Sequence, residues 1–306
     1  MPTDKPSSPG TSLTRPLQPL RGVRVLSLAL NLPGPAALMR LKAMGARCRK
    51  AEPPGPAGGS GDPMAQYCAN AYSTLHDGIA VLTVDLKSDQ GQARLHRELA
   101  RTDVLLTSFR PSALVKLGLS WKALHHAHPH LCLVAIVGAP GLHAEEPGHD
   151  LTYLAEAGLV TGLELPATLF ADMGGALMAS EATLQAVLAR QRTGKGNHQT
   201  VALSDAADWL ALPRTWGLTK AGSAVGGGHA GYRVYPCQDG RVAVAALEPH
   251  FAAALCEAAG VTMHGMATLF EPATHTAIAA FLGGRTRRQL DRLARTRDIP
   301  LHTLAR

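Results

Sequence analysis

The chain has 306 residues, 46% of them hydrophobic and 17% charged, so most of its length can bury a core and is not intrinsically disordered. Aromatic residues make up only 4%, which argues against a protein that binds single-stranded nucleic acid by base stacking. The net charge is +7, but residues 285–306 hold seven Arg and two Asp and supply +5 of it. This segment is typical of a solvated basic helix, and the alternative is an arm that binds nucleic acid or a membrane surface. We favour the first interpretation and expect neither partner.

The predicted elements follow a leader at residues 1–20 that is rich in Pro, Ser and Thr and is expected to be disordered. Apolar runs predict strands at 23–30, 47–51, 80–84, 104–107, 131–137 and 199–203. Helical patterns predict helices at 36–44, 88–101, 173–192 and 205–218. This alternation predicts an α/β fold in which a mainly parallel sheet is covered by helices on both faces, within a large domain at 21–220.

A second, smaller domain is predicted at residues 232–306. Five glycines fall within residues 221–231, which makes this segment a linker between the two domains. Residues 232–235 and 241–245 have strand patterns and are separated by an Asp-Gly pair, the residue pair that favours a tight hairpin turn. Helices are expected after the hairpin, so the second domain is predicted to be α+β.

Several functions are excluded because their motifs are absent. The first turn after a strand reads Leu-Pro-Gly-Pro-Ala and lacks the G-x-G-x-x-G that lets a backbone approach a pyrophosphate. Neither a P-loop nor a G-x-S-x-G serine elbow occurs. The five cysteines are scattered without a CxxC pair, which argues against disulfides and a zinc site. No run of 18 apolar residues, the length of a membrane-spanning helix, occurs, so we expect a cytoplasmic protein. From the cysteine spacing we expect no bound metal.

Three ionisable groups stand beside glycine or proline and are candidates for catalysis: His149, Asp172 and Glu248. Each also has a purely structural explanation. Asp172 precedes a predicted helix and could cap it, His149 and Asp150 could cap a helix at 151–157, and Glu248 could begin an exposed helix. Together they would provide a general base and two carboxylates, as acid-base chemistry in a cleft requires.

A series of short motifs then resembles one family over about residues 20–300. The motifs, which occur in the family's order, include Pro33-Gly34-Pro35, Ala51-Glu52-Pro53-Pro54-Gly55, Val84-Asp85-Leu86-Lys87, Phe109-Arg110-Pro111, Pro147-Gly148-His149-Asp150, Asp172-Met173-Gly174-Gly175 and Arg192-Thr193-Gly194-Lys195-Gly196. The chain resembles the family III CoA-transferases of the CaiB/BaiF type. Gly-His-Asp, Asp-x-Gly-Gly and Glu248-Pro249 make it most similar to the α-methylacyl-CoA racemase branch.

The resemblance implies a Rossmann-like large domain without nucleotide binding, a small second domain and an interlocked homodimer. It implies an acyl-CoA substrate, with CoA entering as part of the substrate rather than as a bound cofactor. In a racemase, His149 and Asp172 would exchange the proton α to the thioester on opposite faces, with Glu248 supporting Asp172. In a transferase, Asp172 would instead form a mixed anhydride while CoA moves to a free acid. A degenerate member that binds CoA without catalysis is the third alternative.

Some positions depart from the family pattern. Residues 76–80, His-Asp-Gly-Ile-Ala, replace a basic run that helps hold CoA, and the glycine-aromatic-glycine turn becomes Gly138-Ala139-Pro140-Gly141. The predicted CoA-binding set is therefore Arg110, Arg47, Arg49, Lys50 and Asp150, in which the basic groups would bind the phosphates. The family's C-terminal return segment is expected to be missing, because the chain ends at Arg306.

Overall fold

The computed structural model of the protein describes residues 17–305, so most of the leader expected at 1–20 lies outside the described residues. The chain separates after Leu210 into two compact units. Helix α9 (Leu203–Thr215) crosses this boundary. Each unit is considered by itself.

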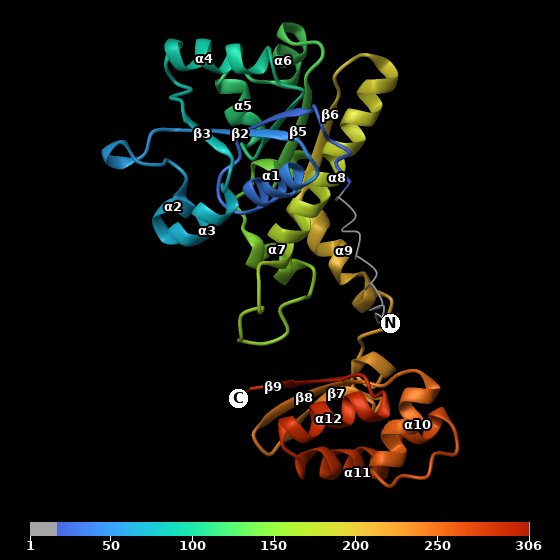
Figure 1. The fold of residues 1–306 in the computed structure, drawn as a ribbon. Helices are drawn as coiled ribbons and strands as arrows, with labels where there is room; N and C mark the ends of the chain where they lie inside the picture. The colour runs from blue at the N-terminus through green and yellow to red at the C-terminus, as the bar shows by residue number, and fades with distance from the viewer. Residues whose placement is uncertain (1–16, 306) are drawn as a thin grey trace, which may run out of the picture. The chain divides into compact units, whose positions relative to one another are not determined.

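The first unit is built on a parallel sheet of six strands (Figure 1). The strands are β1 (Arg24–Ser27), β2 (Arg47–Glu52), β3 (Ala80–Thr83), β4 (Val104–Thr107), β5 (Cys132–Val137) and β6 (His198–Ala202). Their order is β3-β2-β1-β4-β5-β6, and all neighbouring pairs are parallel. This is the order of a doubly wound Rossmann-type sheet, so the predicted α/β class with a parallel sheet is confirmed.

Helices cover both faces of this sheet (Figure 1). Besides α9, they are α1 (Pro33–Ala43), α2 (Pro63–Tyr67), α3 (Ala69–Leu75), α4 (Asp89–Leu99), α5 (Pro111–Lys116), α6 (Trp121–Ala127), α7 (Asp150–Glu156) and α8 (Phe170–Thr193). Successive residues of a strand point to opposite faces of the sheet and pack into different hydrophobic cores. In β4, Val104 and Leu106 pack with α1 and α8. Leu105 packs with α4, α5 and α6 on the other face. All three side chains are fully buried, which explains why the strand reads as a continuous apolar run.

The turn from β1 into α1 explains why this Rossmann-type sheet has no dinucleotide motif. A Cβ on Gly34 would lie 2.1 Å from the Cβ of Ala29, so the helix packs against the turn too closely for any other residue. Pro33 and Pro35 have no N–H, and Leu32 makes no side-chain cap at the helix start. The first turn of α1 therefore presents few free amides to a phosphate, unlike the helix start of a dinucleotide site.

The second unit is a small α+β structure, as predicted. Strands β7 (Tyr232–Cys237), β8 (Gly240–Ala245) and β9 (Leu301–Leu304) form an antiparallel sheet in that order. Helices α10 (Pro249–Ala258), α11 (Pro272–Gly283) and α12 (Arg287–Arg297) share its core, to which Val242, Leu255, Ile278 and Leu290 contribute. The Asp-Gly hairpin joins β7 to β8, whereas β9 was not predicted.

The basic C-terminal segment forms α12, a helix with one buried face. Thr286 caps it through a hydrogen bond from the backbone N–H of Gln289, and Leu290 is fully buried. The segment is therefore a helix packed through Leu290, and the expectation that it binds neither nucleic acid nor a membrane stays a prediction. Within residues 17–305, no helix has the length and apolar character needed to cross a membrane.

Gly34→Ala is expected to destabilise the first unit by about 1–3 kcal/mol, because the new methyl group would overlap Ala29 in a turn that cannot move freely. Gly162→Ala is the control, since a Cβ at Gly162 meets no atom within 4 Å. Urea unfolding of both variants measures the difference. Equal midpoints would contradict the close packing of α1 on this turn.

Candidate active site

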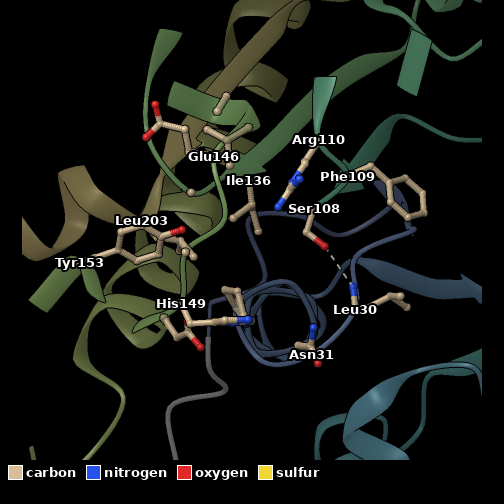
Figure 2. Close-up of a pocket in the computed structure, with 16 residues that line it drawn as sticks. Leu30, Asn31, Ser108, Phe109, Arg110, Ile136, Glu146, His149, Tyr153 and Leu203 are labelled. Carbon is tan, nitrogen blue, oxygen red and sulfur yellow. Dashed lines mark hydrogen bonds between the residues drawn. The ribbon is translucent and has the colours of Figure 1, made fainter. Parts of the chain in front are cut away.

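A cavity of about 170 Å³ opens at the carboxyl ends of β1, β4 and β5 (Figure 2). Leu30 and Asn31 line it from the turn after β1, and Ser108 and Arg110 line it from the turn after β4. Ser108 Oγ accepts a hydrogen bond from the Leu30 amide at 3.2 Å, which ties the two turns together. The strand order reverses between β1 and β4, and ligands of open α/β sheets bind at such switch points.

Asp172 reaches this cavity from the first turn of α8. The helix begins at Phe170, three residues earlier than predicted, so Asp172 is its third residue and not its cap. Leu169 occupies the cap position and makes no side-chain hydrogen bond there. The positive end of the helix dipole favours the ionised carboxylate of Asp172.

Asp150 holds the start of α8 from the neighbouring helix. Its side chain is 5% exposed, and its Oδ1 accepts a hydrogen bond from the backbone N–H of Asp172 at 3.0 Å. Asp150 is the first residue of α7, so one hydrogen bond fixes α8 to α7. Asp150, which the sequence predicted to bind CoA, is thus hydrogen-bonded to the backbone of Asp172.

The environment of Asp172 raises the pKa of its carboxyl from 3.8 to about 6. Burial is the largest cause, the negative charge of Asp150 adds to it, and His149 opposes both effects. At pH 7 the group is mainly ionised, yet it can accept a proton readily. The same carboxylate can also act as a nucleophile.

His149 lines the cavity from the position preceding α7. Its backbone is fixed twice by Thr152, whose hydroxyl accepts from the His149 N–H at 3.1 Å and donates to its carbonyl at 2.8 Å. Figure 2 shows its exposed imidazole extending into the cavity. The structure therefore brings the two predicted catalytic residues, His149 and Asp172, to one cavity.

Tyr153 is a cavity residue that the sequence did not indicate. It is 7% exposed, and a Cβ on Gly138 or Gly148 would come within 2.2 Å or 2.4 Å of its hydroxyl oxygen. Only glycine at both positions leaves room for this hydroxyl. Burial raises the pKa of Tyr153, and the charge of Asp172 adds to the effect, so the phenol stays protonated as a hydrogen-bond donor. The two glycines are the sequence signal that could have identified it.

Of the predicted phosphate-binding residues, Arg110 alone lines this cavity, where its guanidinium is exposed. Arg47 and Arg49 line a separate cavity of about 310 Å³, and Arg49 pairs there with Glu98 at 2.5 Å. Arg47 is the first residue of β2, so it lies at the opposite edge of the sheet from the carboxyl ends of the strands. These two arginines are not brought to the candidate site.

Lys50 and Glu248 do not belong to the lining of this cavity within the first unit. The Lys50 side chain is 0% exposed, and its ammonium is held by Asp62, Glu52 and His76. Glu248 belongs to the second unit, where it is exposed at the start of α10.

A second cavity of about 270 Å³ opens at the same edge of the sheet. It lies at the ends of β2 and β3, is lined by Glu52 and by residues 84–87, and shares Phe109 with the first cavity. Lys87 adds one cation to its lining. Among residues 17–305, no group of three His, Cys, Asp or Glu side chains is placed to hold a metal ion. Through their shared Phe109, the two cavities are neighbours at this edge of the sheet.

Residues 20–306 match the sequence profile of CoA-transferase family III, and the chain belongs to this family. It is 33% identical to a succinyl-CoA–D-citramalate CoA-transferase of Chloroflexus aurantiacus over 201 residues, which are 60% of this chain and 49% of that protein. It is 31% identical to human α-methylacyl-CoA racemase over 260 residues, 79% of this chain and 65% of the racemase. A crystal structure of a hypothetical protein from Mycobacterium tuberculosis matches with a TM-score of 0.79 and 26% identity, covering 94% of this chain and 85% of that one.

These matches confirm the resemblance found in the sequence, including the similarity to the racemases. The chain spans about half to two thirds of the length of the two curated relatives. Their names describe different reactions of CoA thioesters, CoA transfer and racemisation, at similar identity. The family is thus one of enzymes that act on CoA thioesters.

Asp172→Asn is expected to stabilise the protein at pH 7 by on the order of 1–3 kcal/mol, because the variant no longer buries a charge. The pKa of Asp172 is raised on folding, so its ionisation opposes the folded state. The gain should be absent below about pH 3, where the carboxyl is protonated in both states, and should grow until about pH 6. Thermal unfolding of both proteins across pH measures it, and parallel curves would contradict the raised pKa.

Proposed function

We propose that the protein is an acyl-CoA racemase or epimerase that inverts the carbon α to the thioester of a 2-methylacyl-CoA. The observation that carries the proposal is one cavity lined by a carboxylate with a pKa of about 6 and by an imidazole. Asp172 and His149 come from different helices, which suits an acid and a base that approach a substrate from two sides.

The chemistry is a 1,1-proton transfer. The Asp172 carboxylate removes the α-proton and leaves an enolate, and protonated His149 then donates a proton to the opposite face. The cycle ends with a neutral imidazole and a protonated Asp172, the pair that catalyses the reverse direction. The Tyr153 hydroxyl is a protonated donor in the same cavity and can stabilise the enolate oxygen. Glu248, the predicted support for Asp172, stays a prediction.

The two neighbouring cavities support a CoA thioester as the substrate. Ligands of drug size occupy about 300–1,000 Å³, so the cavity of about 170 Å³ suits only the reacting end of such a molecule. The second cavity, reached past Phe109, offers an apolar site for the adenine and the cation of Lys87 for a phosphate. Arg110 provides a further cation at the first cavity.

CoA transfer is the second candidate, and one observation favours it. The half-buried Asp172 stands in the first turn of α8, where the helix dipole stabilises an anionic nucleophile. In this reaction the Asp172 carboxylate attacks the thioester, expels the CoA thiolate and forms a mixed anhydride. The thiolate then attacks the aspartyl carbonyl, which releases the first acid and leaves an aspartyl-CoA thioester. The acceptor acid attacks that thioester to form a second anhydride, and the expelled thiolate attacks its acyl carbonyl to give the new acyl-CoA and free Asp172. The transfer needs Asp172 but not His149.

Deuterium exchange distinguishes the two reactions. With a 2-methylacyl-CoA in heavy water, the wild-type protein should incorporate α-deuterium detected by mass spectrometry, and Asp172→Asn should abolish it. His149→Ala should lower exchange by about 10²-fold or more, since it removes the second acid-base group. His126→Ala is the control, because this exposed histidine on α6 lines neither cavity.

Each alternative has its own outcome. Retained transfer between a thioester and a free acid in His149→Ala, without α-exchange in the wild type, would establish the transferase. A wild-type protein whose Tm rises with CoA, but which neither exchanges the α-proton nor transfers CoA, would establish the non-catalytic alternative.

We also propose a homodimer. Exposed apolar side chains of α8 and α9, among them Leu177, Trp209 and Leu210, line a groove of about 350 Å³. Contiguous apolar surface of this kind is typical of a protein interface. Light scattering should give twice the monomer mass, and Trp209→Glu should shift it toward the monomer. A monomeric wild-type protein would refute the proposal.

A further inference from the structure

The turn after β1 places an asparagine in the candidate active site in an unusual conformation. Asn31 lines the first cavity, and its φ of 61° lies in the left-handed region (Figure 2). Asparagine tolerates this region better than most residues, but glycine adopts it more easily still. Within residues 17–305, the Asn31 carboxamide makes no hydrogen bond to another residue, so its donor and acceptor are free for a ligand.

A buried carboxylate fixes the backbone at this position. Asp62 is 0% exposed, and its Oδ1 accepts hydrogen bonds from the Asn31 N–H at 3.1 Å and from the Met64 N–H at 3.0 Å. The second of these bonds caps α2. Asp62 therefore joins the cavity turn to the start of a helix through one side-chain oxygen.

Lys50 holds Asp62 in place. An ammonium has three N–H donors, and Lys50 has three acceptors: Asp62 Oδ2, Glu52 Oε2 at 3.2 Å and His76 Nε2 at 3.1 Å. His76 Nδ1 lies 2.6 Å from the Tyr72 carbonyl and donates to it, which leaves Nε2 as an acceptor. A buried ion with every donor satisfied gives a rigid cluster, and this cluster links β2 to the Asn31 turn.

We propose that Asn31 is a substrate-contacting residue, whose carboxamide donates a hydrogen bond to the carbonyl oxygen of the bound thioester, and that Asp62 and Lys50 are its positioning residues. This inference rests on the proposed acyl-CoA reaction and deepens it. The thioester oxygen gains negative charge in the enolate, so a donor held rigidly beside it lowers the barrier more than it strengthens substrate binding. The buried ionic cluster fixes the backbone from which the carboxamide extends, and so limits how far the donor can move while charge develops.

Replacement by glycine separates the carboxamide from the backbone conformation. Asn31→Gly keeps the left-handed turn and removes the donor, so kcat should fall by about 10²-fold with a smaller change in KM. Asn31→Asp keeps the shape and replaces the donor by an acceptor, and it should also lose activity. Ala57→Gly is the matched control: Ala57 has a φ of 53°, and it lines neither of the two site cavities.

A double-mutant cycle tests the positioning residue. Asp62→Asn weakens the pair with Lys50 and should lower kcat in the wild-type background. It should have little further effect on kcat in the Asn31→Gly background, because the group that it positions is already gone. Its effect on Tm should be the same in both backgrounds, which separates positioning from general destabilisation.

The outcomes distinguish this inference from the proposed function. Wild-type kcat in Asn31→Gly, with α-exchange intact, would overturn the role of Asn31 and leave the proposed reaction standing. Independent effects of Asp62→Asn and Asn31→Gly on kcat would overturn the positioning role. A wild-type protein that neither exchanges α-deuterium nor binds CoA in calorimetry would overturn the proposed function and this inference together.

Discussion

The hydrogen bond from the Asp172 amide to the buried Asp150 carboxylate is the contact on which the candidate site depends. It fixes the first turn of α8 to the first residue of α7, and the residue immediately before Asp150 is His149. This hydrogen bond between two helix starts therefore helps bring the two proposed acid-base groups to one cavity. Burial is the larger cause of the raised pKa of Asp172, and the same contact adds to it by placing a second negative charge beside the carboxyl.

This arrangement also explains how much of the site the sequence could predict. His149 follows a glycine directly, and Asp172 lies two residues before one. Both stand near predicted element ends, and both reach the cavity. Tyr153 was missed because a tyrosine inside a helix is usually a core residue, and only the space left by Gly138 and Gly148 indicates its place. Side-chain chemistry near element ends can be read from sequence, but the fit of a hydroxyl against two glycines cannot.

The basic residues show a second limit on what the sequence could predict about the site. Positive charge alone does not say at which edge of a sheet a residue lies, and Arg47 opens β2 whereas Arg110 follows the end of β4. In a parallel sheet these positions are at opposite edges. Lys50 was unpredictable for another reason, since its partners Asp62 and His76 lie 12 and 26 residues away along the chain. A lysine that appears solvent-facing in the sequence becomes a core residue once three acceptors surround it.

Local patterns identified most of the fold where burial is complete. Residues 104–107 and 132–137 are fully buried on both faces and were predicted as strands from their apolar runs. Short elements were lost: α2 lies in a segment rich in glycine and proline, and its start depends on Asp62, whose role comes from a tertiary contact with Lys50. Strand β9 has only four residues and forms because β8 offers an edge from a distant part of the chain.

The turn after β1 unites these observations. In a dinucleotide-binding sheet, the amides at the start of the first helix hold a pyrophosphate at the switch point. Here Pro33 and Pro35 remove amides from that helix start, while Gly34 lets α1 pack close to Ala29. The cavity at the same switch point is lined instead by side chains, with Asp172 and His149 on one part of its wall and Asn31 on another. Ionisable side chains thus stand at the switch point where a dinucleotide site has backbone donors, although the strand order is the same, and this difference is what the proposed proton transfer requires.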